Sequence, residues 1–139
     1  MENPPKSQAT VCDASIDAIL PLKPSGSYGV DDLGRADILL ASIATFFDDA
    51  LLNTLLIVSP AADVSSVQRL ASRWPTLPIE VMSEEALLPE LLHYPKLRGW
   101  RRQQLVKLGA SRVLDRPYCI TFDADIFCTR PIHYEQLVP

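Results

Sequence analysis

The sequence has little that would place it in a membrane or in an oxidising compartment. No stretch approaches the ~18 consecutive apolar residues that a membrane-spanning helix requires. Residues 1–10 are polar, contain Pro4 and Pro5, and lack the apolar core of a signal peptide. The chain has three cysteines, an odd number without paired spacing, which is typical of a reducing compartment. We therefore expect a cytoplasmic protein without a transmembrane segment.

Several familiar catalytic and binding patterns are also missing. The sequence has no G-x-S-x-G turn, no P-loop and no G-x-G-x-x-G pattern. His93 and His133 lack the C-x-x-C or H-E-x-x-H surroundings of common zinc sites. The net charge is −4 and no long basic run is present, which argues against a nucleic acid as the partner. A local group of basic residues instead suggests a small anionic ligand: Lys96, Arg98, Arg101, Arg102 and Lys107.

What is present is the composition of one globular domain. The chain has 139 residues, of which 47% are hydrophobic and 22% are charged. That length is enough to bury a substantial core. We expect residues 1–14 to form a disordered lead-in and residues 15–139 to form the folded domain.

Short apolar runs alternate with amphipathic segments along residues 15–139. Four runs are expected to be strands: 15–20, 54–58, 79–82 and 118–122. Helical spacing or turn signals mark the segments between them: 31–47, 64–74, a short turn over 84–92, and 101–113. This alternation predicts an α/β fold with a mostly parallel sheet flanked by helices. In the last helix we expect Leu105, Leu108 and Val113 to face the core.

Two acids follow the last predicted strand directly. The run 118–122 is β-prone and largely apolar, which predicts a strand buried on both faces, with Cys119 as a small core residue. Asp123 and Asp125 come next, at the strand end where α/β folds bind ligands. Neighbouring carboxylates repel unless a cation lies between them, and Mg²⁺ or Mn²⁺ binds carboxylates together with phosphate oxygens and water. We predict a metal site that holds a diphosphate; the alternative is one capping acid and one solvated acid.

Two further segments could contact the same ligand. Gln103 and Lys107 are four residues apart on a predicted helix and therefore share a face. The loop of Pro21, Leu22 and Lys23 follows the first strand, at the ligand-binding edge of such sheets. An ordinary solvated helix face and a plain surface loop are the respective alternatives.

These elements together resemble the GT-A glycosyltransferases. The resemblance rests on the strand before Asp123-Ala124-Asp125, the helix segment 99–108 and the opening segment 17–23, and it covers residues 15–139. In particular, the chain is similar to a bacterial family of uncharacterised nucleotide-diphospho-sugar transferase-like proteins. The resemblance implies a metal-dependent glycosyltransferase that uses Mn²⁺ or Mg²⁺ and a nucleotide-diphosphate sugar.

The resemblance also implies roles for individual residues. Asp123 would lie near the ribose or the metal, and Asp125 would bind the metal. Pro21, Leu22 and Lys23 would border the nucleoside, and Lys107 would face the donor beside Gln103.

The chain is shorter than GT-A domains usually are, so the match is to a truncated, donor-binding part, and no catalytic residue is assigned. A non-catalytic nucleotide-sugar-binding or relic domain is the main alternative. A phosphatase of the haloacid dehalogenase type, with Asp123 as its nucleophile, is another.

Overall fold

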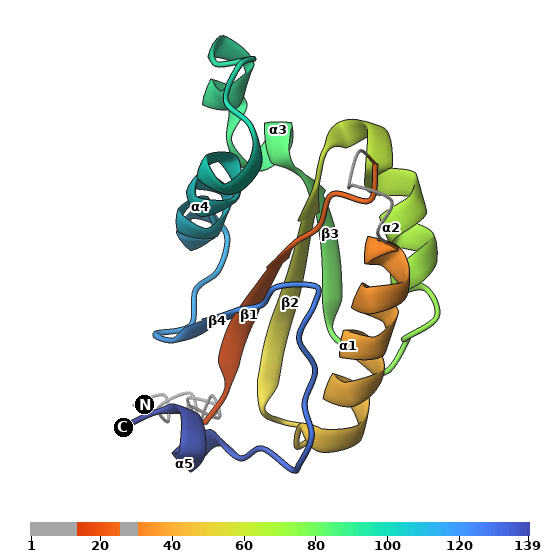
Figure 1. Cartoon of the computed structure of the whole chain (residues 1–139). Coiled ribbons are helices and arrows are strands. Elements are labelled where there is room, and N and C mark those ends of the chain that lie inside the picture. Colours follow the sequence, from red (N-terminus) through yellow and green to blue (C-terminus); the bar gives the residue numbers. More distant parts are fainter. Residues whose placement is uncertain (1–13, 26–30) are drawn as a thin grey trace, which may run out of the picture.

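The computed structural model describes residues 14–25 and 31–139 (Figure 1). Apart from Ala14, the expected lead-in lies outside these residues. Each predicted strand and each long predicted helix is present, in the predicted order. The elements are β1 (Ile16–Pro21), α1 (Asp32–Phe46), β2 (Leu52–Ser59), α2 (Val64–Ala71), β3 (Ile79–Ser83), α3 (Glu84–Leu87), α4 (Gly99–Gly109), β4 (Cys119–Thr121) and α5 (Tyr134–Leu137). Among the described residues, no helix has the length and apolar character needed to cross a membrane.

The four strands form one parallel sheet in the order β3-β2-β1-β4. β1 lies at the centre, where Ala18 is level with Leu55 of β2 and with Ile120 of β4. The expected α/β fold with a parallel sheet flanked by helices is therefore confirmed.

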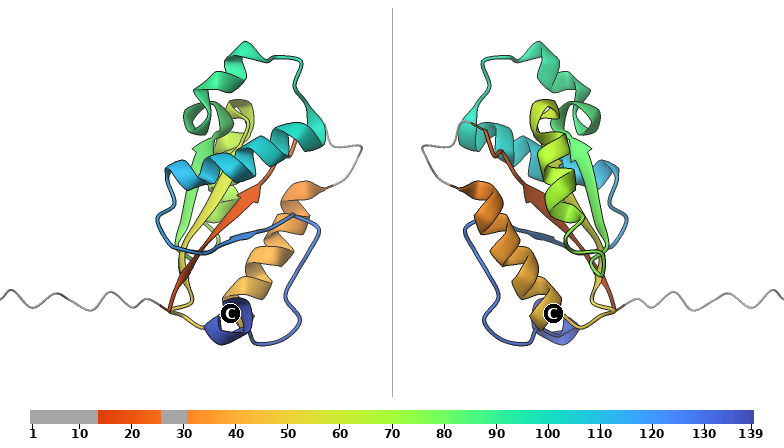
Figure 2. Two further views of the ribbon diagram at one scale, coloured as in Figure 1. Left: turned by 90° about the vertical axis from the view of Figure 1, so that its left-hand side faces the viewer. Right: turned by 90° about the vertical axis from the view of Figure 1, so that its right-hand side faces the viewer.

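Helices cover both faces of the sheet (Figure 2). Side chains of β1 and β2 point alternately to the two sides, as in any strand. Leu20, Leu55 and Ile57 pack with α1 and α2, whereas Ile19 and Leu56 pack with α3 and α4. This two-sided burial explains why the central strands read as continuous apolar runs.

The helix starts follow local capping chemistry. The Asp31 carboxylate accepts a hydrogen bond from the Gly34 amide at 2.8 Å, so Asp31, rather than the equally plausible Asp32, caps α1. Ser83 caps α3 in the same way, because its hydroxyl accepts a hydrogen bond from the Ala86 amide at 3.0 Å. α2 ends at Ala71, earlier than expected, in a turn that leads to Pro75.

The predicted inward face of α4 is wrong. Leu105, Leu108 and Val113 are 42%, 73% and 46% exposed, while Val106 and Ala110 are buried against the sheet. The physical reason lies in the small residues at the end of the helix. A Cβ added to Gly109 would lie 2.8 Å from the Leu88 side chain, so this glycine permits a close approach that a larger residue would prevent.

The expectation that the last strand is buried on both faces is also wrong. β4 is a three-residue edge strand that pairs with β1 alone, and both Cys119 and Thr121 are exposed. The loop that leads into β4 is fixed by the Asp17 carboxylate, which is fully buried. This carboxylate accepts hydrogen bonds from the backbone amides of Asp115 and Arg116, at 3.1 and 3.0 Å.

Candidate functional site at the carboxyl edge of the sheet

The acid pair follows β4 as predicted, on an exposed turn anchored by a buried neighbour. The Phe122 amide donates a hydrogen bond to the Ile19 carbonyl at 2.8 Å, which continues the pairing of β4 with β1. The Phe122 ring is buried and lies 6.3 Å, centre to centre, from the Phe47 ring. Asp123 and Asp125 are exposed on either side of the half-buried Ala124. The turn is therefore accessible to a ligand while the core holds its start.

Lys107 of α4 reaches the acid pair. Its Nζ lies 2.9 Å from Oδ1 of Asp123. The lysine side chain is 16% exposed and that of Asp123 is 57% exposed, so Asp123 is the more accessible member of the pair. The structure thus brings together two of the predicted site residues that are 16 positions apart in the sequence.

The other predicted site residues make no direct contact with the acid pair among the contacts that the structure describes. Gln103, one turn before Lys107, is exposed, and within the described part of the chain it makes no hydrogen bond to either acid. Pro21 and Leu22 are buried, and the Leu22 amide donates to the Val58 carbonyl at 2.8 Å, which extends the sheet. Lys23 is exposed. In this loop, Lys23 is therefore the side chain that a ligand could reach most easily.

The side chains at this turn could hold a divalent cation only if other ligands complete its coordination shell. Among the described residues, no group of three or more His, Cys, Asp or Glu side chains could hold a metal ion. Two exposed carboxylates suit Mg²⁺ or Mn²⁺, because these ions commonly take one or two protein carboxylates and complete their shell with phosphate and water. The chemistry of Asp123 and Asp125 therefore fits a metal that is shared with a phosphate ligand.

A hollow of about 180 Å³ lies beside Asp125. α1 contributes Arg35 and Ile38 to it, and the turn contributes Ala124, Asp125, Ile126 and Phe127. A larger hollow of about 400 Å³ lies further along the C-terminal segment, and neither acid of the pair lines it. The smaller hollow is the more relevant one, because it combines a carboxylate and a guanidinium next to the predicted site.

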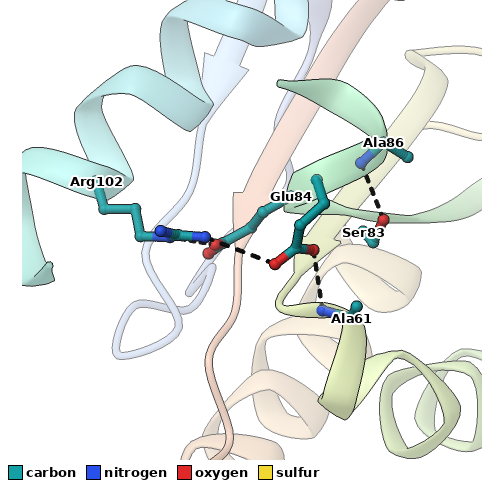
Figure 3. A network of polar contacts seen from close by, with 6 residues as sticks. Ala61, Ser83, Glu84, Ala86 and Arg102 are labelled. Atoms are coloured by element: carbon teal, nitrogen blue, oxygen red, sulfur yellow. Dashed lines mark hydrogen bonds and ion pairs between the residues drawn. The ribbon is translucent and has the colours of Figure 1, made fainter. Parts of the chain in front are cut away.

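A partly buried ion pair holds α4 against the start of α3, just after β3 (Figure 3). Nε of Arg102 contacts Oε2 of Glu84, and its Nη2 lies 3.6 Å from Oε1 of Glu85. Glu85 also accepts a hydrogen bond from the Ala61 amide at 3.1 Å. Glu84 is buried, so its charge depends on Arg102 for a partner. This network fixes the helix that carries Lys107.

Sequence reasoning missed several polar groups at this edge. Besides Glu84 and Glu85 they include Asp63, which is buried after β2 and accepts a hydrogen bond from the Ser25 hydroxyl at 2.7 Å. The hydroxyl of Ser59, the last residue of β2, is buried and has no hydrogen-bond partner in the part of the chain that the structure describes. The signal that could have found Ser59, Glu84 and Glu85 is their position just after the predicted strands 54–58 and 79–82. Asp63 lies further along, after Pro60, and this signal would not have found it.

The fold resembles that of a known glycosyltransferase. The apo form of mouse xyloside xylosyltransferase 1 has a TM-score of 0.60 to this chain, at 12% sequence identity. The match covers 88% of this chain and 47% of that protein, so the chain spans about half the length of the transferase. At such low identity the likeness shows the fold alone, and it confirms the expected GT-A-like architecture. No curated protein matches the chain.

A family model covers nearly the whole chain. The match extends over residues 13–139 and includes every element of the sheet and the acid pair. The model is that of a family of unknown function, DUF6492, and the chain belongs to this family.

Proposed function

We propose that this chain is the nucleotide-sugar-binding part of a metal-dependent glycosyltransferase. The observation that carries the proposal is the juxtaposition at the end of β4. Asp123 and Asp125 are exposed on one turn, and the ammonium of Lys107 lies 2.9 Å from Asp123. A metal shared with a diphosphate commonly takes one or two carboxylates, and a nearby positive group can bind the phosphates. The resemblance of the fold to a xylosyltransferase supports the same interpretation.

The proposed roles follow from the chemistry of each side chain. Asp125 and Asp123 would hold Mn²⁺ or Mg²⁺, which when bound neutralises charge on a departing nucleoside diphosphate. Lys107 would donate a hydrogen bond to a phosphate oxygen. Pro21, Leu22 and Lys23, at the end of β1, would border the nucleoside. The exposed side chain of Gln103 would contact the donor without contacting the acid pair.

A calorimetric titration tests the proposal. UDP and GDP would each be titrated into the protein with and without Mn²⁺. We expect binding in the presence of Mn²⁺, and a loss of about tenfold or more in Asp125→Asn, because the variant removes a ligand charge. Asp49→Asn is the matched control, since Asp49 is also an exposed acid but lies between α1 and β2, away from the site. Equal binding by Asp125→Asn, or no binding by the wild type, would contradict the proposal.

The alternative of a non-catalytic nucleotide-sugar-binding domain makes the same binding prediction. It differs in turnover. Conversion of a bound nucleotide sugar to free sugar or glycoside by the purified chain would refute the alternative. Binding without any turnover would support it.

A further inference from the structure

The contact between Lys107 and Asp123 has a consequence for how a metal and a diphosphate would bind. In the function proposed above, the metal takes oxygens of Asp123, but one of them, Oδ1, already accepts a charge-assisted hydrogen bond from Lys107 at 2.9 Å. A bound metal would also place two positive charges close to the ammonium. In the absence of other ligands, the ammonium and the metal would therefore compete for Asp123.

Lys107 cannot avoid this competition by a movement of its helix. Arg102 ties the start of α4 to Glu84 and Glu85. The end of α4 packs through Val106 and Ala110 into the core on the sheet. Only a movement of the lysine side chain can therefore relieve the competition. For that movement the ammonium needs another anionic partner within its reach.

A diphosphate supplies that partner. With a divalent cation at the pair, three formal positive charges would face the two carboxylates. The phosphate oxygens of a nucleoside diphosphate offset this excess and accept hydrogen bonds from an ammonium group. The Nζ–Oδ1 hydrogen bond would then be replaced by one from Nζ to a phosphate oxygen, and both oxygens of Asp123 would become available to the metal.

We propose that Lys107 weakens the binding of a divalent cation alone and couples that binding to a diphosphate. The proposal rests on the function proposed above. In this scheme Lys107 is a positioning and coupling residue. The protein would hold its metal more tightly when the donor is present, because the donor releases Asp123 from the lysine.

The test measures free Mn²⁺ by electron paramagnetic resonance during titration of the full chain, with and without UDP. Lys107→Met should bind Mn²⁺ alone more tightly than the wild type does, by about fivefold or more. The increase in Mn²⁺ affinity caused by UDP should be correspondingly smaller in the variant. Arg69→Met is the matched control, because it removes the charge of an exposed basic residue on α2, away from the acid pair, and should leave both quantities nearly unchanged.

A double-mutant cycle separates competition from a general loss of positive charge. In an Asp123→Asn background, Lys107→Met should change the affinity for Mn²⁺ alone by less than about twofold, since the charged partner for which the two cations compete is gone. Thermal melting of each variant would confirm that it is folded.

The outcomes distinguish the two proposals. If the wild type binds UDP with Mn²⁺ through Asp125 but Lys107→Met gains no affinity for Mn²⁺ alone, the coupling is refuted and the proposed function stands. An equal gain from Lys107→Met in the Asp123→Asn background would also refute the coupling. If the wild type binds Mn²⁺ tightly and UDP does not change that affinity, both proposals fail.

Discussion

The centre of the sheet and the C-terminal segment, residues 119–139, are built in opposite ways. Every residue of β1 is buried, and β2 is buried except near its start. β4 is short and exposed at both ends. After Phe122, the segment that follows it packs against the core only through partly buried residues such as Cys128, Ile132 and Val138. The Cys128 amide donates to the Ser42 hydroxyl, and the Ile132 amide donates to the Phe46 carbonyl, both at 2.9 Å.

The acid pair lies where these two regions meet. Phe122 belongs to the core, and the next residues turn out into solvent. A rigid scaffold that carries functional residues on an exposed connection is the common arrangement of binding sites. The centre of the sheet therefore stabilises the fold, while the exposed C-terminal segment makes the acid pair accessible to a ligand.

The largest expected difference between the two regions is in stability. Leu55→Ala removes a fully buried side chain from the centre of the sheet and should lower the free energy of unfolding by about 2–5 kcal/mol. Leu137→Ala makes the same chemical change in α5, where the side chain is 38% exposed, and should cost less than about 1 kcal/mol. Denaturant unfolding of both variants measures this difference. Similar losses would show that the C-terminal segment is part of the main core.

A similar or smaller effect is expected at the ion pairs that flank the two ends of α4. Arg102→Met leaves the buried Glu84 without its partner, and should cost about 3 kcal/mol in the free energy of unfolding. Arg112→Met removes an exposed partner of Glu90, and its cost should be much smaller because solvent screens that pair. Chemical denaturation provides the comparison. The interpretation of α4 as a helix anchored by Arg102 would be wrong if both variants lost the same stability.

The smallest expected effect depends on pH and concerns the C-terminal segment. Nδ1 of His133 lies 2.6 Å from Oδ2 of Asp48, and this hydrogen bond raises the pKa of the histidine above its ordinary value of 6.5. A raised pKa stabilises the fold fully below pH 6.5, and that contribution is lost as the pH rises through the folded-state pKa.

The wild type should therefore be slightly more stable than Asp48→Asn at acidic pH, with the difference shrinking toward alkaline pH. Thermal melting of both proteins across this range, with a titration of the His133 ring signals by NMR, would test the effect. An unchanged His133 pKa in Asp48→Asn would rule out the contact as its cause.

The sequence predicts the order of the elements well, because strands such as β2 are buried on both sides and helices such as α1 carry clear caps. It fails where burial depends on distant partners. The apolar run before Asp123 does not reveal that β4 has one neighbour and an exposed Cys119. The inward face of α4 was predicted wrongly because Val106, together with the small residues Gly109 and Ala110, packs against Leu88 and the sheet in place of Leu105 and Leu108.

For the site, the sequence predicts the acids and their position after a strand. It also proposes Lys107 as a neighbour, and the structure places that lysine against Asp123. The partners of α4 could not be predicted in the same way. Glu84 and Arg102 are 18 residues apart and meet only because the chain folds back over the sheet.

The central claim is that the turn after β4 holds a divalent metal together with a nucleoside diphosphate. Its most direct test is paramagnetic broadening of assigned backbone NMR signals by Mn²⁺ in the presence of UDP. We predict the strongest broadening at Asp123, Ala124 and Asp125, with Lys107 next. Strongest broadening at another acidic group, such as Glu84 and Glu85 or Asp48 and Asp49, with the signals of the acid pair unaffected, would contradict the claim.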